Sequence, residues 1–264
     1  MDPEDILSTS LDTFYGYHPV ALGSAGTTFR YAPTGEAFTI AVQVPDTAAA
    51  NWSLHTSGVW ISSIYLADHL NDLRLQDHIG TLGPGQHLRV LELGAGSGLP
   101  GILIAKKFPN IAVTVSDYPD ERLVQDLANN VARNGVTNTC RTVAHAWGSD
   151  SVAALLNGSD GFDIVIAADT LWNPEMHELF ISTLRATLRK SPSSKIHLVA
   201  GLHTGRYTIQ AFLIALGANG FELDDIVEKQ CSGSDEREWC TFREGEDERE
   251  RRRWVIWMKI RWSC

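Results

Sequence analysis

Short apolar runs alternate with amphipathic stretches along most of the chain after residue 87. The apolar runs are rich in Val, Ile and Leu, which is typical of buried strands, whereas the longer stretches repeat apolar residues at helical spacing. The strands are expected at residues 88–93, 111–117, 140–145, 162–169 and 195–202, and the helices at 97–108, 120–135 and 174–190. Since strands that alternate with helices form a parallel sheet covered on both faces, the pattern predicts an α/β fold.

The two ends of the chain follow other patterns. Residues 27–44 contain two β-rich runs around a Pro-Thr-Gly-Glu turn, which indicates a β-hairpin. Apolar positions then recur at helical spacing from Thr56, a possible N-cap, to about Asn71. At the other end, residues 220–230 and 252–262 are two β-like runs with no helix expected between them, so they should pair as an antiparallel hairpin.

These elements divide the chain into an N-terminal extension with a hairpin, residues 1–55, and a main domain, residues 56–264. Residues 243–253, inside the terminal hairpin, mix acidic and basic side chains, which favours a solvated loop over a basic docking arm. The helix at residues 174–190 has a clear start, because Asn173 is a suitable cap and Pro174 a suitable first helical residue.

Composition and charge narrow the function classes. The chain has 264 residues, 44% of them hydrophobic, which suffices for one large domain with a full core. Its formal net charge of -10 repels phosphate backbones, so nucleic-acid binding is not expected. The sequence shows neither a secretory signal nor an apolar run long enough to cross a bilayer, which predicts a cytoplasmic protein without membrane partners. The four cysteines lack zinc-site spacing, so no metal is expected.

A glycine-rich turn, in the run VLELGAGSGLPG, follows the first strand of the main domain. Gly94, Gly96 and Gly98 let the backbone turn tightly and approach a ligand without Cβ interference, and the next helix presents free N–H groups. A nicotinamide dinucleotide site requires a third glycine where this chain has Leu99. The alternate glycine spacing, with Glu92 two residues before it, fits a methyltransferase better. A tight turn without a ligand is the structural alternative.

Acids and tryptophans follow the later strands. Asp117 ends the second strand, where a carboxylate can accept hydrogen bonds from both ribose hydroxyls or, alternatively, cap the helix that begins near Asp120. Trp147 follows the third strand, where it can cover an adenine or pack in the core. Asp169 and Trp172 follow the fourth strand and are candidates for an acceptor site, because ligands bind at this sheet edge. A surface acid and a packed aromatic are the alternative there.

In this order and at these strand ends, the features resemble those of the seven-stranded S-adenosylmethionine-dependent methyltransferases related to protein lysine methyltransferases. The chain is similar to fungal proteins called nicotinamide N-methyltransferase-like, whose better-understood members modify the N-terminus and a nearby lysine of translation elongation factor 1-alpha. The likeness covers residues 27–262, including VLELGAGSGLPG, VSDYPD and AWG. It implies a Rossmann-like, seven-stranded sheet with a terminal antiparallel hairpin and S-adenosylmethionine as the cofactor.

The resemblance also implies roles for single residues around the cofactor. Glu92 and the glycines correspond to the residues that hold the methionine moiety. Asp117 with Tyr118 corresponds to the ribose and adenine site, and Trp147 to the residue that flanks the adenine. Trp60 looks like the tryptophan that closes the cofactor pocket from the N-terminal helix, although such a residue is commonly core.

The acceptor side is less defined by the resemblance. Asp169 corresponds to the family acid after the fourth strand, but Trp172 stands where the family has Tyr or Phe, which leaves the acceptor open. His203 follows the fifth strand and could accept a proton, yet nothing distinguishes it among nine histidines. A protein amine, with elongation factor 1-alpha as first candidate, ranks before a small amine or pyridine. A dinucleotide oxidoreductase and a non-catalytic cofactor-binding module are the competing classes.

Overall fold

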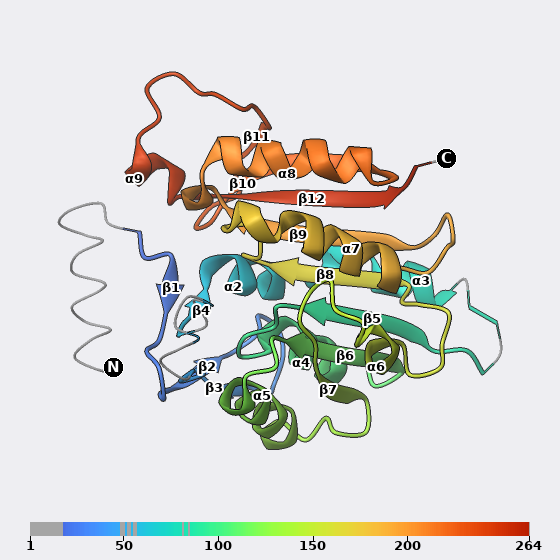
Figure 1. Ribbon diagram of the computed structural model, residues 1–264. Coiled ribbons are helices and arrows are strands. Elements are labelled where there is room, and N and C mark those ends of the chain that lie inside the picture. Colours follow the sequence, from blue (N-terminus) through green and yellow to red (C-terminus); the bar gives the residue numbers. More distant parts are fainter. Residues whose placement is uncertain are drawn as a thin grey trace.

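An eight-stranded sheet with the order β11-β10-β12-β9-β8-β5-β6-β7 forms the centre of the computed structural model, which describes residues 18–47, 51, 54, 57–80, 82–83 and 85–263 (Figure 1). Five neighbouring strands are parallel. They are β5 (Leu88–Leu93), β6 (Ile111–Asp117), β7 (Cys140–Ala144), β8 (Ile164–Ala168) and β9 (Lys195–Gly201). All five occupy the predicted apolar runs, so the predicted α/β sheet is confirmed.

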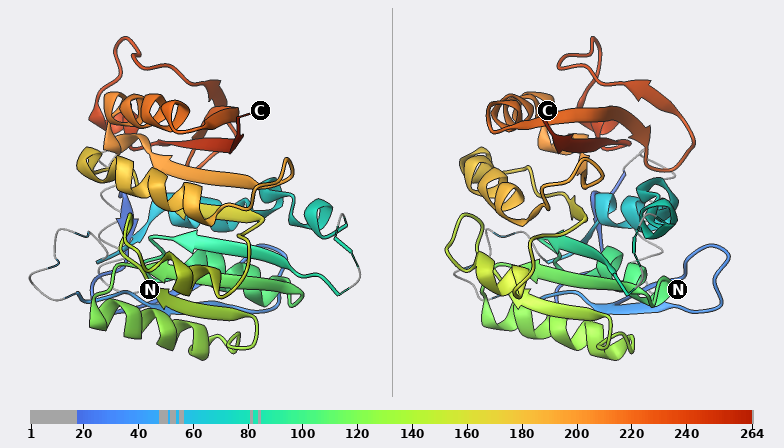
Figure 2. Two further views of the ribbon diagram at one scale, coloured as in Figure 1. Left: turned by 45° about the vertical axis from the view of Figure 1, so that its right-hand side comes forward. Right: turned by 90° about the vertical axis from the view of Figure 1, so that its right-hand side faces the viewer.

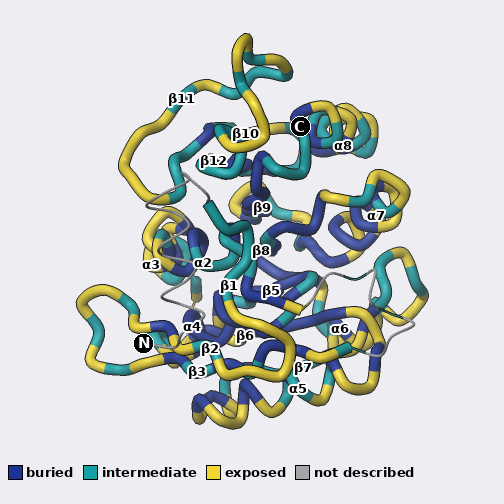
Figure 3. The backbone as a smooth tube through the Cα atoms, turned by 90° about the vertical axis from the view of Figure 1, so that its left-hand side faces the viewer, coloured by how far each residue is buried: buried dark blue, intermediate teal, exposed yellow. Residues whose placement is uncertain are grey.

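Helices cover both faces of this sheet (Figures 2 and 3). The sheet thereby separates the core into two apolar clusters, one on each face. The first cluster contains Val90 and the helices on one face: α2 (Ile61–Asp68), α4 (Leu99–Lys107) and α5 (Glu121–Arg133). The second contains Leu91 and the helices on the other: α6 (Val152–Leu156), α7 (His177–Thr187) and α8 (Arg206–Ala218). Val90 and Leu91 separate because successive strand side chains point to opposite faces.

Asp120 and Asn173 each cap a helical segment with their side chains, and of these two Asn173 is the expected cap. Asp120 caps α5 through its carboxylate, which accepts the N–H groups of Arg122 and Leu123. Asn173 caps the 3-10 turn η3 (Pro174–Met176), and this turn leads into α7, whose end at Thr187 comes three residues earlier than expected. No helix in the described ranges is both long enough and apolar enough to span a membrane.

The C-terminal strands pair as predicted but with an unexpected insertion. β10 (Phe221–Gln230) and β12 (Trp254–Trp262) are antiparallel, and β12 lies between β9 and β10. A short strand, β11 (Glu236–Glu238), adds to the outer edge of β10. The expected seven strands therefore become eight. Helix α9 (Glu248–Arg251) lies on the connection to β12, where no helix was expected.

The prediction of a solvated loop at residues 243–253 is wrong in part. Arg206 donates hydrogen bonds to both Glu228 and Glu246, and Arg237 bonds to the same two carboxylates. The side chains of Glu228 and Glu246 are 0% and 2% exposed. Buried charges persist when they are paired and hydrogen-bonded. These ion pairs fix the connection to the start of α8, which sequence spacing alone does not indicate.

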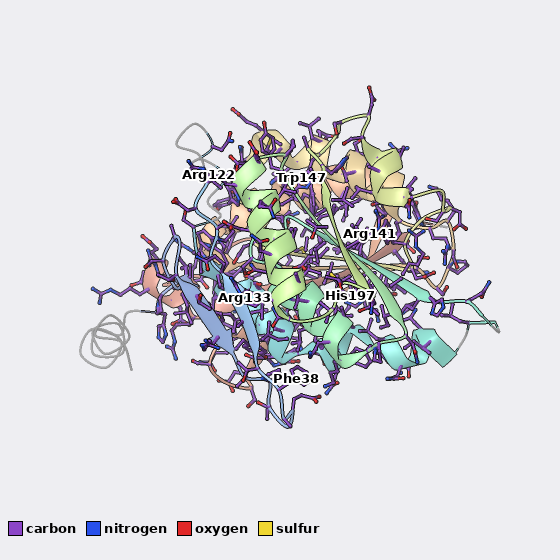
Figure 4. All side chains as sticks on the ribbon, turned by 90° about the horizontal axis from the view of Figure 1, so that it is seen from below. Phe38, Arg122, Arg133, Arg141, Trp147 and His197 are labelled. Atoms are coloured by element: carbon purple, nitrogen blue, oxygen red, sulfur yellow. The ribbon has the colours of Figure 1, made fainter. Side chains whose placement is uncertain are left out.

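The N-terminal hairpin of β2 (Thr28–Tyr31) and β3 (Ile40–Gln43) is confirmed, and it packs on α5. The side-chain amides of Asn130 and Asn134 each exchange two hydrogen bonds with the backbone of β3, at Gln43 and Ala41. Figure 4 shows Arg133, on the same helix, beside the hairpin strands. The hairpin thus shares the core of the first face with the sheet.

The single helix expected from Thr56 to Asn71 is confirmed only over α2 (Ile61–Asp68). Thr56 lies outside the described residues, and the chain there forms β4 (Val59–Trp60), which pairs with β1 (Ala21–Leu22). Helix α2 follows, then the 3-10 turn η2 (Leu70–Leu73) and α3 (Leu75–Gly80). Arg74 adopts a left-handed conformation between the last two segments, which separates η2 from α3.

Candidate active site

A cavity of about 340 Å³ opens at the carboxyl ends of β5, β6 and β8. This is where the chain reverses direction across the sheet, since β6 and β8 lie on opposite sides of β5. The cavity is lined by residues from both halves of the domain: Asn51, Leu54, Gly58, Val59, Trp60, Ser63, Glu92, Gly94, Ala95, Gly96, Ser97, Asp117, Tyr118, His145, Trp147, Ala168, Asp169, Thr170, Trp172, Asn173 and Met176. Every predicted site residue except Gly98 is among them.

The glycine turn forms the floor of this cavity. Gly94, Gly96 and Gly98 all have positive φ angles, between 53° and 79°, a region that favours glycine. A Cβ on Gly94 would stand 2.8 Å from Thr170 and 3.2 Å from Trp147, whereas a Cβ on Gly96 would project into open space. Gly98 faces the core instead, because its Cβ would lie 2.6 Å from Leu127. Gly98 therefore shapes the turn from outside the cavity.

Glu92 is a buried carboxylate at the end of β5. It is 2% exposed and accepts a hydrogen bond of 2.9 Å from the N–H of Gly101 in α4. Gly101 must be small, because a Cβ there would lie 2.5 Å from Glu92 Oε2 and from Val115. Burial raises the pKa of Glu92 to about 8, which the Gly101 bond opposes. A cationic group placed beside Glu92 would restore its charge.

Asp117 ties the end of β6 to the glycine turn. One carboxylate oxygen accepts the N–H of Gly96 at 2.6 Å, and the other accepts the N–H of Tyr118 at 2.7 Å. Burial raises the pKa of Asp117 to about 6 despite these bonds. The alternative role as helix cap is wrong, since Asp120 caps α5. Asn51 donates to Asp120 at 2.6 Å and also lines the cavity.

Trp147 forms a side wall after β7. Its ring packs against Phe180 with a centroid distance of 4.6 Å, and it also contacts the glycine turn at Gly94. Figure 4 places Trp147 at the same end of the molecule as Arg122 in the first turn of α5. His145 lies behind it, with its two ring nitrogens 2.7 Å and 3.4 Å from the hydroxyls of Ser151 and Thr183. Trp147 is thus both core and cavity wall.

Asp169 follows β8 in a left-handed conformation, with φ of 53°. Non-glycine residues rarely adopt this conformation, and those that do cluster at functional sites. Its Oδ1 accepts the N–H of Gly201 at 2.7 Å. Among the described residues, its buried Oδ2 has no hydrogen-bond partner. An unsatisfied buried carboxylate oxygen in a cavity indicates a site for a hydrogen-bond donor. Trp172 stands at the rim and is 36% exposed.

Trp60 reaches the cavity from the N-terminal part of the chain, before the first strand of the main sheet. It ends β4, precedes α2 and lines the cavity, and its ring stacks on His203 at a centroid distance of 5.6 Å. The sequence also gave no specific reason to place Ser63 or Met176 at the cavity. Their only signal is proximity in sequence to Trp60 and Trp172, because each follows within a few residues of a predicted site residue.

The residues present fit S-adenosylmethionine. The open space at Gly96 permits close approach of a ligand to the backbone, and Asp117 lies beside it where a ribose can bond to a carboxylate. Glu92 is available to the methionine ammonium, and the unsatisfied Asp169 oxygen lies across the cavity. No group of three metal-binding side chains occurs among the described residues. Fold and cavity together define an S-adenosylmethionine-dependent methyltransferase.

Similar proteins identify the family within this class. A family model described as lysine methyltransferase matches residues 51–216, more than half of the chain, and the chain belongs to that family. A relative in Schizosaccharomyces pombe, protein N-terminal and lysine N-methyltransferase efm7, is 26% identical over 67% of this chain and 69% of its own length. Its counterpart in Gibberella zeae is 31% identical over 53% of this chain and 59% of its own length.

A solved structure shows the same fold at low sequence identity. The glycopeptide N-methyltransferase MtfA, complexed with sinefungin, superposes with a TM-score of 0.51 and 11% identity. The similarity covers 74% of this chain and 86% of that one. At this identity the match supports the Rossmann-like methyltransferase sheet alone.

Proposed function

We propose that this enzyme transfers a methyl group to a nitrogen of a protein, either a lysine or an N-terminal amine. The unsatisfied Oδ2 of Asp169 carries the proposal, because a buried carboxylate suits an amine that becomes cationic as it is methylated. The names of the relatives, protein N-terminal and lysine N-methyltransferases, support a protein acceptor. Translation elongation factor 1-alpha is the first candidate, and the cytoplasm is the expected compartment.

The chemistry depends mainly on position and electrostatics. When bound, S-adenosylmethionine supplies an electrophilic methyl group on a sulfonium. Asp169 is held by the N–H of Gly201, so its free oxygen can orient the acceptor nitrogen and stabilise the charge that develops on it. Trp172 and Trp60 add aromatic faces that attract a cation. Their walls also exclude water from the nitrogen.

The glycine-rich turn does not support the competing hypothesis of a dinucleotide-dependent oxidoreductase. Leu99 is fully buried at the first position of α4, where a dinucleotide site needs a glycine for close packing. The net charge of -10 favours a basic protein partner, although screening limits such attraction beyond about 8 Å at physiological salt.

A methyl-transfer assay tests the proposal. Purified elongation factor 1-alpha and nicotinamide are offered side by side with tritiated S-adenosylmethionine, together with an extract that contains other proteins. Label on a lysine or N-terminal amine of a protein is the expected result. Asp169→Asn serves as the matched inactive control, because it changes the carboxylate alone. Labelled nicotinamide with no labelled protein would instead make this a small-molecule enzyme.

A further inference from the structure

His203 is not among the residues that line the cavity, but it lies next to two that do, Trp60 and Asp169. It lies in the 3-10 turn η4 (Leu202–Thr204), directly after β9, and its half-buried ring stacks on Trp60 with the planes at 13°. A Cβ on Gly201 would collide with the His203 ring and lie 3.3 Å from Asp169 Oδ1. Glycine at this position therefore lets the imidazole and the Asp169 carboxylate approach the same point.

An amine acceptor must lose a proton before it can be methylated. A lysine side chain is protonated at neutral pH, with an ordinary pKa of about 10.4, and the ammonium has no lone pair to attack a methyl group. A base works best when its pKa lies near the operating pH, which favours an imidazole, at about 6.5, over an ordinary carboxylate, at about 3.9. An imidazole close to Asp169 would therefore suit this proton transfer.

Three titratable residues that line the cavity are engaged elsewhere. Glu92 accepts the N–H of Gly101 on the cofactor side, and Asp117 accepts two backbone N–H groups. His145 lines the cavity, and both of its ring nitrogens lie beside hydroxyls, those of Ser151 and Thr183. Asp169 stabilises the developing cation best when it stays ionised. His203 is the imidazole on the acceptor side.

We propose that His203 is a second functional residue of the acceptor site and takes the proton from the acceptor ammonium. This inference rests on the proposed amine acceptor. In the step, one N–H bond of the ammonium breaks, and its proton forms an N–H bond with the neutral imidazole. The freed lone pair then forms the N–C bond as the S–C bond of the donor breaks, and that electron pair stays on sulfur. The partly exposed imidazolium returns its proton to water.

The charges around η4 are compatible with this role. Helix α8 contributes Arg206, whose guanidinium is bonded to Glu228 and Glu246. In α9 the carboxylates of Glu248 and Glu250 pair with arginines, and Arg249 and Arg251 complete its charged residues. β12 brings the uncharged Val255 opposite Gly201. Asp169 Oδ1 and the His203 ring approach the same point at Gly201.

Three variants separate proton transfer from packing. His203→Phe keeps a flat ring against Trp60 without a base, His203→Asn removes the ring, and His203→Ala leaves space for added imidazole. His87→Asn is the matched control, because His87 is exposed and precedes β5 at the opposite edge of the sheet. The full-length enzyme is assayed with elongation factor 1-alpha from pH 6 to 10, and S-adenosylhomocysteine affinity is measured by calorimetry.

All three variants should lose on the order of 100-fold in kcat/KM at neutral pH, the usual contribution of a general base. The loss should shrink towards pH 10, where free amine is abundant, and imidazole should partly rescue His203→Ala. In the parent, the acid limb of kcat/KM should follow the His203 ring titration seen by NMR. Cofactor affinity should stay unchanged. An active His203→Phe, or a pH-independent loss without rescue, would overturn the role of His203. Absence of any labelled protein amine with the parent enzyme would instead overturn the proposed function.

Discussion

The cofactor side and the acceptor side of the cavity are built in different ways. On the cofactor side, Glu92, Gly96 and Asp117 lie within 26 residues of sequence, on two adjacent strands and one turn. Their polar groups bond to one another, as in the contact of Gly96 with Asp117. On the acceptor side, Asp169 follows β8 and accepts the N–H of Gly201 at the end of β9. Trp60, which by the resemblance closes the cofactor pocket, comes instead from a segment more than a hundred residues away.

The satisfaction of polar groups also differs between the two sides. Both oxygens of Asp117 accept backbone hydrogen bonds, whereas Asp169 keeps one oxygen without a partner among the described residues. A satisfied carboxylate shapes a binding loop before the ligand arrives. A carboxylate oxygen without a partner gains its hydrogen bond only when a substrate with a donor group binds. Substitutions on the acceptor side should therefore act on turnover, and those on the cofactor side on binding or stability.

The largest effect is expected at Asp169. Asp169→Asn keeps an oxygen for the Gly201 N–H and a residue type that tolerates a left-handed backbone, but it removes the negative charge. Turnover should fall roughly 100- to 1000-fold, the range for loss of one stabilising group in a transition state. Steady-state kinetics measure kcat, and calorimetry should show unchanged affinity for S-adenosylhomocysteine. Asp160→Asn, at an exposed acid, is the control. Parental kcat in Asp169→Asn would remove Asp169 from the mechanism.

The next largest effect concerns Glu92 in the cofactor-free protein. Because burial raises its pKa to about 8, folding favours the protonated form, and the associated stability is lost as pH rises from about 4.5 through 8. Glu92→Gln should therefore have a larger free energy of unfolding than the parent at pH 8.5, by on the order of 5 kcal/mol, and a similar one near pH 4.5. Urea titrations at both pH values measure this difference. A variant less stable than the parent at pH 8.5 would show that Glu92 is ionised before the cofactor binds.

A smaller effect is expected at Asp117. Asp117→Ala removes a carboxylate from the cavity and releases the N–H of Gly96, so S-adenosylhomocysteine should bind about 1 to 3 kcal/mol more weakly, the range for charged hydrogen bonds. Calorimetry measures the affinity, and Asp225→Ala, at an exposed position of β10, serves for comparison. Retained affinity together with reduced turnover would assign Asp117 to the acceptor side and contradict the division of the cavity into two sides.

The smallest effect is expected at Trp172, which is partly exposed at the rim. Trp172→Ala should raise KM for the protein acceptor several-fold, corresponding to about 0.5 to 1 kcal/mol for an exposed cation–aromatic contact. Trp172→Phe, which restores the aromatic type of the family, should recover most of this loss. Thermal unfolding of both variants separates lost packing from lost binding. A change in cofactor affinity instead of acceptor KM would move Trp172 to the other side of the comparison.

Local signals were sufficient for most of the sheet and for the cofactor side. The parallel strands and the cap at Asn173 follow from apolar runs and turn chemistry that each act over a few residues. The prediction of a helix from Thr56 was wrong at its start because Val59 and Trp60 form β4, which pairs with β1. Helical spacing carries no information about such a pairing. The prediction of a solvated loop at residues 243–253 was wrong in part for a similar reason. Glu246 bonds to Arg206, which lies forty residues earlier in the sequence.

The sequence by itself determined the alternation of strands and helices, the glycine turn and the identity of the acids at the strand ends. These features depend on backbone freedom and side-chain periodicity within short segments. Only the tertiary structure decided that Gly98 faces the core, that Trp60 stacks on His203, and that one oxygen of Asp169 stays unsatisfied. Burial and hydrogen-bond partners are properties of the packed chain, because they depend on which distant segments meet once the two faces of the sheet are covered.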